Sequence, residues 1–421
     1  MILSRSTKAS YAVLIACVIS HFMNHVYTSG LSPFLTAIQT DLGINYTQIG
    51  IATSAAIVAM TTAHLLVGYL GDRGMRDIFI SVSVLLAALA IFLTSFSDNF
   101  VTLTIFQIFL GLGASGYHPS SFPALADKFP RDRSKATGIQ AMGGLLGMAV
   151  TPFLGVTLFV AFGSWQASLQ VLGVIGIILF VPTFLLMRFS NGKSAKQEEE
   201  EFERTHIIDS EEVICDGAEG WNRNFWLIVV LMGLRGMSFR STSLLMPLYL
   251  AVEYSTGLVN AGYLTAVMLT AGLFGEVVSS YYSDRWGRRV PFLMASTGIA
   301  TPALLLLNFH LDLIQLVLIL IFIGFFFYLG VPPNTAYQTE VCPRNSRGLA
   351  FGLLFSIGSI PGAISPIIFG IIGDNFGLPA SILFLVITTF LATIVTFFLR
   401  DVNTKHTNPS SLKIVDSYDI E

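Results

Sequence analysis

The chain has 421 residues, of which 53% are hydrophobic and only 12% are charged. An ordinary soluble domain carries about twice that share of charged residues, so the composition excludes a soluble protein and predicts an integral membrane protein. A net charge of -3 excludes a nucleic-acid-binding protein that works by neutralising many phosphates. The three cysteines lie far apart, without the spacing of a zinc site or a disulfide framework. We therefore expect neither a metal nor a cofactor.

Twelve stretches are long and apolar enough to cross the hydrocarbon core of a bilayer as helices, which takes roughly 20 residues each. In chain order they cover about 10–38, 47–70, 77–97, 100–128, 134–162, 166–188, 223–252, 259–282, 290–309, 312–340, 347–373 and 377–400. The first stretch is too long for a removable signal peptide and lacks a small-residue cleavage site, so we expect it to stay as the first span. The sequence thus predicts an all-α membrane protein with twelve transmembrane helices.

Lysine and arginine lie on one side of this predicted bundle. Of the 23 basic residues, all but Arg235 and Arg240 fall in the termini or in the loops that follow the even-numbered spans. Cytoplasmic loops carry an excess of these residues. We therefore expect a multi-pass protein of the cell membrane with both termini in the cytoplasm.

One long hydrophilic interruption divides the chain. It contains four consecutive glutamates and is expected to be a solvated linker. The predicted organisation is an N-terminal six-helix bundle (1–188), a cytoplasmic acidic linker (189–222), a C-terminal six-helix bundle (223–400) and a cytoplasmic tail (401–421).

The two six-helix bundles share features at a nearly constant separation, which indicates an internal repeat. The pairs Asp72-Arg73 and Asp284-Arg285 are 212 residues apart, the runs that begin at Asp127 and Glu340 and end in Pro-Arg are 213 apart, and Thr151-Pro152 and Ser365-Pro366 are 214 apart. The bundles are therefore expected to share one fold.

Twelve spans in two sets of six, with a D-R-x-G-R-type loop after spans 2 and 8, resemble the major facilitator superfamily of secondary transporters. The loop from Asp284 to Arg289 is close to the family pattern, whereas the loop from Asp72 to Arg76 lacks one residue between Arg and Gly. The run Gly116-Tyr117-His118-Pro119 is also similar to the organic-anion and fosmidomycin-resistance-like branches. The resemblance implies a monomer with two bundles around a central cavity, which opens alternately to either side and holds substrate near the midplane.

The same resemblance implies a gating role for the charged loops. Arg73 or Arg76 can pair with Asp127, and Arg288 can pair with Glu340, so that these pairs hold the cytoplasmic side closed. The predicted gating residues are Asp72, Arg73, Arg76, Asp127, Asp284, Arg285, Arg288 and Glu340. Asp77 and Arg289 are expected only to mark the cytoplasmic side.

Two arginines lie inside span 7, Arg235 about 18 Å and Arg240 about 26 Å along the helix from residue 223. Spans 1, 4, 7 and 10 hold no carboxylate at mid-depth, and Glu276 lies within six residues of the predicted end of span 8. Arginine does not lose its proton in proteins, so the pair predicts an anionic substrate held by bidentate hydrogen bonds. The alternative is that Arg235 bonds backbone carbonyls and that Arg240 approaches the outer interface. Further polar residues predicted at the substrate site are Asn24, Tyr117, Asn334 and Gln338.

Three histidines are candidates for proton coupling, since histidine titrates near neutral pH. His21 and His25 are four residues apart and so share one helix face, and His118 lies in span 4. The alternative is that they are hydrogen-bonded packing residues. His64, close to the span 2 loop, is expected to be structural.

The sequence thus favours a proton-coupled transporter of a small organic anion, whose partners are the solute, protons and the lipid bilayer. One alternative is a drug or metabolite exporter that exchanges protons for amphipathic compounds, supported by a partial antiporter motif in span 5, where Thr151 replaces the second glycine. Another is a transporter-like sensor, which would need a large or motif-bearing loop. No nucleophile–base pair, nucleotide loop or metal cluster indicates an enzyme.

Overall fold

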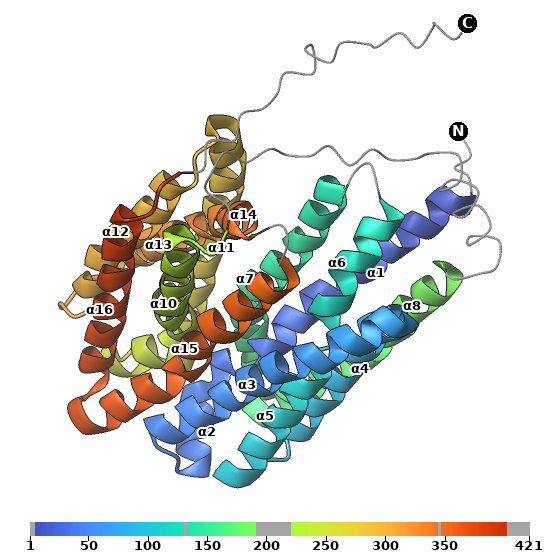
Figure 1. Cartoon of the computed structure of the whole chain (residues 1–421). Coiled ribbons are helices and arrows are strands. Elements are labelled where there is room, and N and C mark those ends of the chain that lie inside the picture. The colour runs from blue at the N-terminus through green and yellow to red at the C-terminus, as the bar shows by residue number, and fades with distance from the viewer. Residues whose placement is uncertain (1–4, 130–132, 191–219, 344–346, 402–421) are drawn as a thin grey trace, which may run out of the picture.

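The computed structural model describes residues 5–129, 133–190, 220–343 and 347–401. Within these ranges all regular secondary structure is helical (Figure 1). Eleven helical segments are long and apolar enough to cross a membrane, and Val290–Leu306 is a shorter apolar helix. The predicted all-α fold with twelve spans is therefore confirmed.

The N-terminal half contains the first six spans. Its elements are α1 (Arg5–Thr28), the 3-10 turn η1 (Ser32–Phe34), α2 (Leu35–Leu42), α3 (Tyr46–Leu70), η2 (Gly71–Met75), α4 (Arg76–Thr94), α5 (Phe100–Ala114), α6 (Tyr117–Lys128), α7 (Arg133–Phe162) and α8 (Trp165–Ser190).

The C-terminal half contains the other six. Its elements are α10 (Arg223–Glu253), α11 (Gly257–Trp286), α12 (Val290–Leu306), α13 (Leu313–Leu329), α14 (Val331–Val341), α15 (Arg347–Phe376) and α16 (Leu378–Phe397). Most of the predicted linker and tail lies outside the described residues, so their assignment stays a prediction.

Spans 4 and 10 are each broken into two helices, at equivalent places in the two halves. Span 4 breaks between α5 and α6, just before His118, and span 10 breaks between α13 and α14 at Gly330. Proline follows both breaks, as Pro119 and as Pro332-Pro333; a proline has no N–H to continue the helical hydrogen bonds. Broken helices in the middle of a transporter place polar backbone and side chains near a central cavity.

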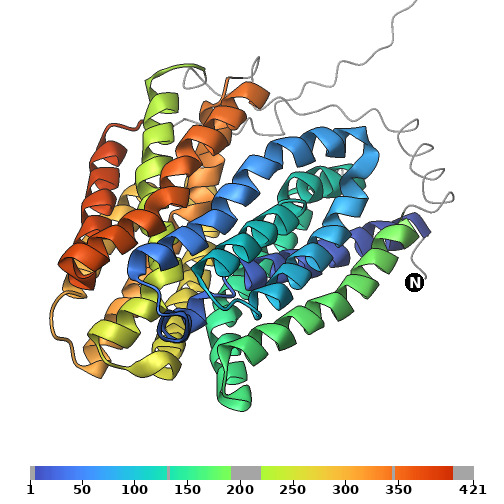
Figure 2. The same cartoon turned by 90° about the horizontal axis from the view of Figure 1, so that it is seen from below.

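The two halves meet along two pairs of helices, α3 with α15 and α7 with α11. In both views of the molecule α3 and α15 lie side by side (Figures 1 and 2). The approach is close because glycine is present at the contacts: a Cβ at Gly50 would overlap the carbonyl oxygen of Pro366, and one at Gly370 would overlap that of Tyr46.

Hydrogen bonds also join the halves, at a contact that we call the outer junction, formed by Ser32, Tyr46, Thr47, Leu244 and Asp374. The Asp374 carboxylate accepts hydrogen bonds from the backbone N–H groups of Tyr46 (2.9 Å) and Thr47 (2.8 Å) and from the Thr47 hydroxyl (2.5 Å). The Ser32 hydroxyl donates to the Leu244 carbonyl at 2.6 Å. The outer junction lies at the start of α3, whereas the charged loop η2 lies at its other end, on what we call the basic face.

Candidate substrate pocket and proton-binding residues

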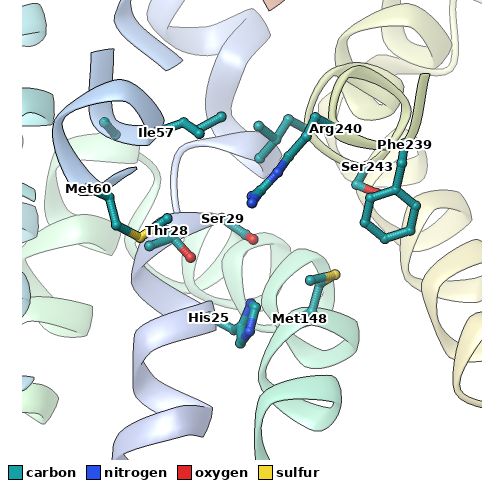
Figure 3. Close-up of a pocket in the computed structure, with 11 residues that line it drawn as sticks. His25, Thr28, Ser29, Ile57, Met60, Met148, Phe239, Arg240 and Ser243 are labelled. Carbon is teal, nitrogen blue, oxygen red and sulfur yellow. The ribbon is translucent and has the colours of Figure 1, made fainter. Parts of the chain in front are cut away.

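A pocket lies between the two halves (Figure 3). It contains about 480 Å³ of space not filled by atoms, including space open to solvent. The residues that line it come from α1, the turn after it, α3, α7 and α10: His25, Thr28, Ser29, Ala56, Ile57, Met60, Met148, Phe239, Arg240, Ser243 and Leu244. The lining is therefore mainly apolar, with one arginine, one histidine and three hydroxyl groups.

Arg240 is the arginine of this pocket. Figure 3 shows its guanidinium pointing from α10 toward Ser29 and His25. Its side chain is exposed, and within the described part of the chain it makes no hydrogen bond and no ion pair. All five of its N–H donors are therefore available to a ligand.

Arg235 lies one and a half turns earlier on α10 and is only 8% exposed. Its Nη2 donates to the Phe327 carbonyl at 2.8 Å, and its guanidinium lies 5.4 Å from the centre of the Phe239 ring. It also interacts electrostatically with Glu276. The sequence analysis left open that Arg235 bonds a backbone carbonyl, and the structure has this contact, because Phe327 is in the last turn of α13, where the helix break leaves carbonyl groups without their usual partners.

The other residues predicted at the substrate site do not line the pocket of Figure 3. The Asn24 amide donates to the Ala114 carbonyl at 2.9 Å, and the Tyr117 hydroxyl donates to the Cys17 carbonyl at 2.8 Å. Both therefore fasten α1 to the broken span 4. Asn334 and Gln338 on α14 are buried, and the Oδ1 atom of Asn334 has no hydrogen-bond partner among the described residues.

The three histidines predicted to carry protons form a cluster. The ring of His21 is centred 5.0 Å from that of His25 and 5.2 Å from that of His118, and the latter two are 6.0 Å apart. One ring nitrogen of each lies within 4.8 Å of those of the other two. This separation is short enough for the three ring nitrogens to hold a common cation.

The protonation of His21 is set by its backbone partner. Its Nδ1 lies 2.8 Å from the Gln140 carbonyl, and because a carbonyl oxygen only accepts, Nδ1 carries the hydrogen and Nε2 keeps a free lone pair. His64, which we expected to be structural, lies at the edge of the cluster, with its ring centre 6.2 Å from that of His118. The cluster adjoins the pocket, since His25 belongs to both.

In the loop after span 2, Arg76 pairs with Asp127. The Arg76 Nη1 lies 3.1 Å from the Asp127 Oδ2, and the two side chains are 30% and 62% exposed. Arg73 instead donates to the Tyr69 hydroxyl and lies over that ring. Of the two partners predicted for Asp127, the structure therefore selects Arg76. The side chain of Asp72 is outside the part of the structure that is described.

In the loop after span 8, Arg289 rather than Arg288 binds Glu340. Arg289 bonds Glu340 at 3.0 Å and Asp284 at 2.6 Å, whereas Arg288 lies 3.6 Å from Asp401. Burial lowers the pKa of the Arg289 guanidinium, but the hydrogen bonds and charges of Glu340 and Asp284 outweigh it, so this pKa is raised above its ordinary value.

The predicted Arg288–Glu340 pair is therefore wrong. The physical reason is the left-handed conformation of Gly287 (φ +61°), which ends α11 and turns the chain. Arg289 then precedes α12, where Asp401 accepts the backbone N–H groups of Arg289 and Val290 at 2.7 and 2.8 Å. Arg285 donates to the Tyr281 hydroxyl at 3.0 Å.

Glu276 is a candidate functional residue that the sequence analysis did not select. It is 7% exposed. The predicted span 8 ends at residue 282, but α11 continues to Trp286, so Glu276 lies about 15 Å from the helix end rather than near it. The signal was a carboxylate inside a predicted span, which by itself marks a candidate site.

Membrane-spanning helices in two halves, with a pocket between the halves and unpaired charge within it, are the architecture of a multi-pass membrane transporter. The profile of the Major Facilitator Superfamily matches residues 17–309 and 228–415, so the chain belongs to this superfamily. It is a transporter-family protein and not an enzyme.

Relatives cover nearly the whole chain. A probable sulfoacetate transporter of Cupriavidus necator is 24% identical over 88% of this chain and 89% of its own. The cis,cis-muconate transport protein of Acinetobacter baylyi is 23% identical over 83% of this chain and 84% of its own. The fosmidomycin resistance protein of Escherichia coli is 21% identical over 88% and 89%. The predicted resemblance to the organic-anion and fosmidomycin-resistance-like branches is thus confirmed.

The fold also matches a solved structure, that of a bacterial homologue of the human lysosomal transporter Spinster in an inward-facing and unoccupied conformation. The TM-score is 0.76 over 93% of this chain and 96% of that one, at 15% identity. This likeness confirms the fold.

Proposed function

We propose that the protein transports a small organic anion together with protons, by alternating access. The observation that carries the proposal is the position of Arg240 in the pocket between the halves, exposed and with no partner among the described residues. An unpaired guanidinium at this depth is costly, and a carboxylate or sulfonate group neutralises it through two parallel hydrogen bonds.

The apolar lining favours an anion that also has an apolar part. Ile57, Met60, Met148 and Phe239 surround the arginine. Two relatives bear names that specify organic anions, sulfoacetate and cis,cis-muconate, which supports the same substrate class for this chain. Arg235 remains a candidate for a supporting role behind Phe239.

The proton is assigned to the histidine cluster of His21, His25 and His118. The cluster adjoins the pocket, and Arg240 acts on His25 and His118 electrostatically. A bound anion near Arg240 therefore favours a proton on the histidines, which is the coupling that a symporter requires.

We also propose an orientation of the protein in the membrane and a gating role for its charged loops. The basic face is cytoplasmic in a cell-membrane protein with both termini inside, following the distribution of lysine and arginine, and the protein acts as a monomer. The loop residues Arg76, Asp127, Asp284, Arg289 and Glu340 are proposed to belong to the cytoplasmic gate.

A proton-driven exporter of amphipathic compounds is the second candidate, favoured by the fosmidomycin resistance protein among the relatives and by the two methionines, Met60 and Met148, in the pocket lining. It requires a pocket that takes a cationic or neutral solute, and Arg240 opposes a cation there.

Ligand binding by the Arg240→Ala variant tests the proposal. The loss of a hydrogen-bonded charge pair should weaken anion binding by about 10- to 100-fold, measured as the rise in melting temperature of the purified protein with sulfoacetate, muconate and other organic anions. Arg223→Ala is the matched control, since Arg223 begins the same helix and lies over the Phe398 ring, away from the pocket. Unchanged anion binding by Arg240→Ala, or stabilisation of the unmodified protein by cationic amphipaths alone, would contradict the proposal.

A further inference from the structure

Glu276 is a buried carboxylate with no hydrogen-bond donor at its side chain among the described residues. It lies in the interior of α11 and is 7% exposed. Within the described residues no hydrogen bond satisfies its carboxylate, which interacts electrostatically with Arg235 and Tyr328. A carboxylate in this position is costly when ionised and so is a candidate for binding a proton.

The groups around Glu276 can be named from each helix that packs against α11. Arg235 faces it from α10, and Tyr328 faces it from α13. On α14, the Tyr337 hydroxyl donates to the Arg400 carbonyl and Glu340 is bound to Arg289. The titratable residues of α7 are confined to its first turn, and η1 has none. Arg235 is therefore the one cation close to Glu276 in the described structure.

This pair lies directly behind the wall of the pocket. The Arg235 guanidinium is 5.4 Å from the ring centre of Phe239, and the Phe239 ring lines the pocket beside Arg240 (Figure 3). Tyr328 forms a second connection: its ring centre is 4.9 Å from that of Phe239, and its hydroxyl lies 2.6 Å from the sulfur of Met148, which lines the pocket from the N-terminal half. A change of charge at Glu276 therefore changes the electrostatic potential in the pocket, because the layer between this pair and the pocket is formed by the Phe239 and Tyr328 side chains.

We propose that Glu276 is a proton-binding residue of the C-terminal half, which links proton binding to anion binding through Arg235. When Glu276 is ionised, it neutralises Arg235, and Arg240 is the sole source of net positive charge at the pocket. When Glu276 binds a proton, the charge of Arg235 is no longer compensated, and the positive potential at the pocket rises. The anion then binds more tightly, and by reciprocity a bound anion favours the proton on Glu276.

The inference rests on the proposed anion transport and adds a second proton site to the histidine cluster. The two sites lie in different halves, and both raise the positive potential at Arg240 when they are protonated. Proton and anion therefore bind together, with Arg235 as the positioning residue that transmits the charge of Glu276.

The Glu276→Gln variant tests the assignment, because glutamine keeps the shape of the protonated acid and cannot ionise. We expect the number of protons taken up on anion binding, followed with an indicator dye in weakly buffered detergent solution, to fall by about one. We also expect the anion affinity of this variant to depend less on pH, with tighter binding than the unmodified protein on the alkaline side. Glu253→Gln is the matched control, an exposed glutamate at the end of α10, and should leave both quantities unchanged.

An undiminished proton uptake in Glu276→Gln would overturn this inference while leaving anion transport intact. Failure of the unmodified protein to bind any of the anions would overturn the proposed function and this inference together. If the variant does not fold, the unmodified protein gives the answer by infrared difference spectroscopy: anion binding should add a band of a protonated carboxylic acid, and the absence of such a band would overturn the assignment.

Discussion

Two arginines on one helix have different environments in this protein. Arg235 and Arg240 are five residues apart on α10, yet Arg235 is bonded to the Phe327 carbonyl and faces Glu276, whereas Arg240 faces the pocket without a partner among the described residues. The difference follows from helix geometry, since five residues turn the side chain by about 140°. We therefore propose Arg240 for the anion site, and Arg235 for charge balance within the C-terminal half.

At the same scale, His118→Gln should weaken the pH dependence of anion binding. Protonation of the histidine cluster adds positive charge beside Arg240, so anion affinity should rise as the pH falls and the cluster takes up protons. Removing the ring that contacts His21, His25 and His64 should reduce that rise severalfold. The measurement is a binding isotherm at several pH values, with His310→Gln, an exposed histidine outside the helices, as the control. The same pH profile for both variants would remove the cluster from the proton pathway.

The sequence predicts which residues belong to the charged loops and the site better than it predicts which residues contact one another. The charge pattern identified Arg76 and Asp127, which pair as expected. It also predicts an Arg288–Glu340 pair, by analogy with the loop of the first half, because a pattern of charges does not reveal the left-handed turn at Gly287 that brings Arg289 to Glu340 instead. The partners of Arg235 lie 92 residues away at Phe327 and on another helix at Glu276, and no local periodicity predicts contacts of that range.

At the scale of helices, the loops that follow α3 and α11 occupy equivalent places in the two halves, but their ion pairs differ in burial and in the number of hydrogen bonds. The Arg76–Asp127 pair is largely exposed and contributes about 0–1 kcal/mol. Arg289 and Glu340 are only 13% and 11% exposed, and Arg289 also donates hydrogen bonds to Asp284 and Ser283. Each network lies within one half, so it fixes the shape of a loop that is proposed to meet the other half when the basic face closes.

The outer junction gives a prediction at this scale. Asp374 accepts the first N–H groups of α3, where a carboxylate is favoured by the helix dipole, and it is supplied by the other half of the protein. Asp374→Ala should therefore weaken the contact between α3 and α15. The contact can be followed with a reporter thiol, Ser29→Cys, in a protein that also carries Cys215→Ser. In the Asp374→Ala variant this thiol should react about 10-fold faster than with Asp374 intact, when a membrane-impermeant maleimide is added from the face of the outer junction.

The matched control is Asp98→Ala, because Asp98 lies in the turn before α5 and its bonds among the described residues are to neighbours within its own half, Asn99 and Thr102. Equal reaction rates in Asp374→Ala and in this control would show that the Asp374 contact does not hold the outer junction closed.

For the molecule as a whole, the sequence predicted the large features well. Span length, the single-sided distribution of arginine and lysine, and the repeat near 213 residues led to twelve spans in two halves, because the bilayer imposes the same length and polarity on every span. The position of the pocket was less predictable, since it depends on how the halves meet. Close contacts such as that of Gly50 with Pro366 decide that arrangement. The sequence does not show which of its 37 glycines lie at the contact between the halves.

In the structure described here, the halves are joined at the outer junction, and Arg240 lies between them. Alternating access requires this junction to separate and the loops of the basic face to come together. In the proposed cycle the bound anion neutralises Arg240, so the loaded carrier is less costly to reorganise within the membrane than a carrier with an unpaired arginine.

The most direct test of this account is uptake of sulfoacetate or muconate into proteoliposomes that contain the purified protein, with a pH gradient imposed across the membrane. The account predicts that the anion accumulates on the alkaline side, that a protonophore abolishes the accumulation, and that Arg240→Ala does not accumulate it. Anion movement that is independent of the pH gradient would contradict proton coupling. Movement of a cationic amphipath toward the acidic side, with no anion transport, would contradict the central claim and identify an exporter.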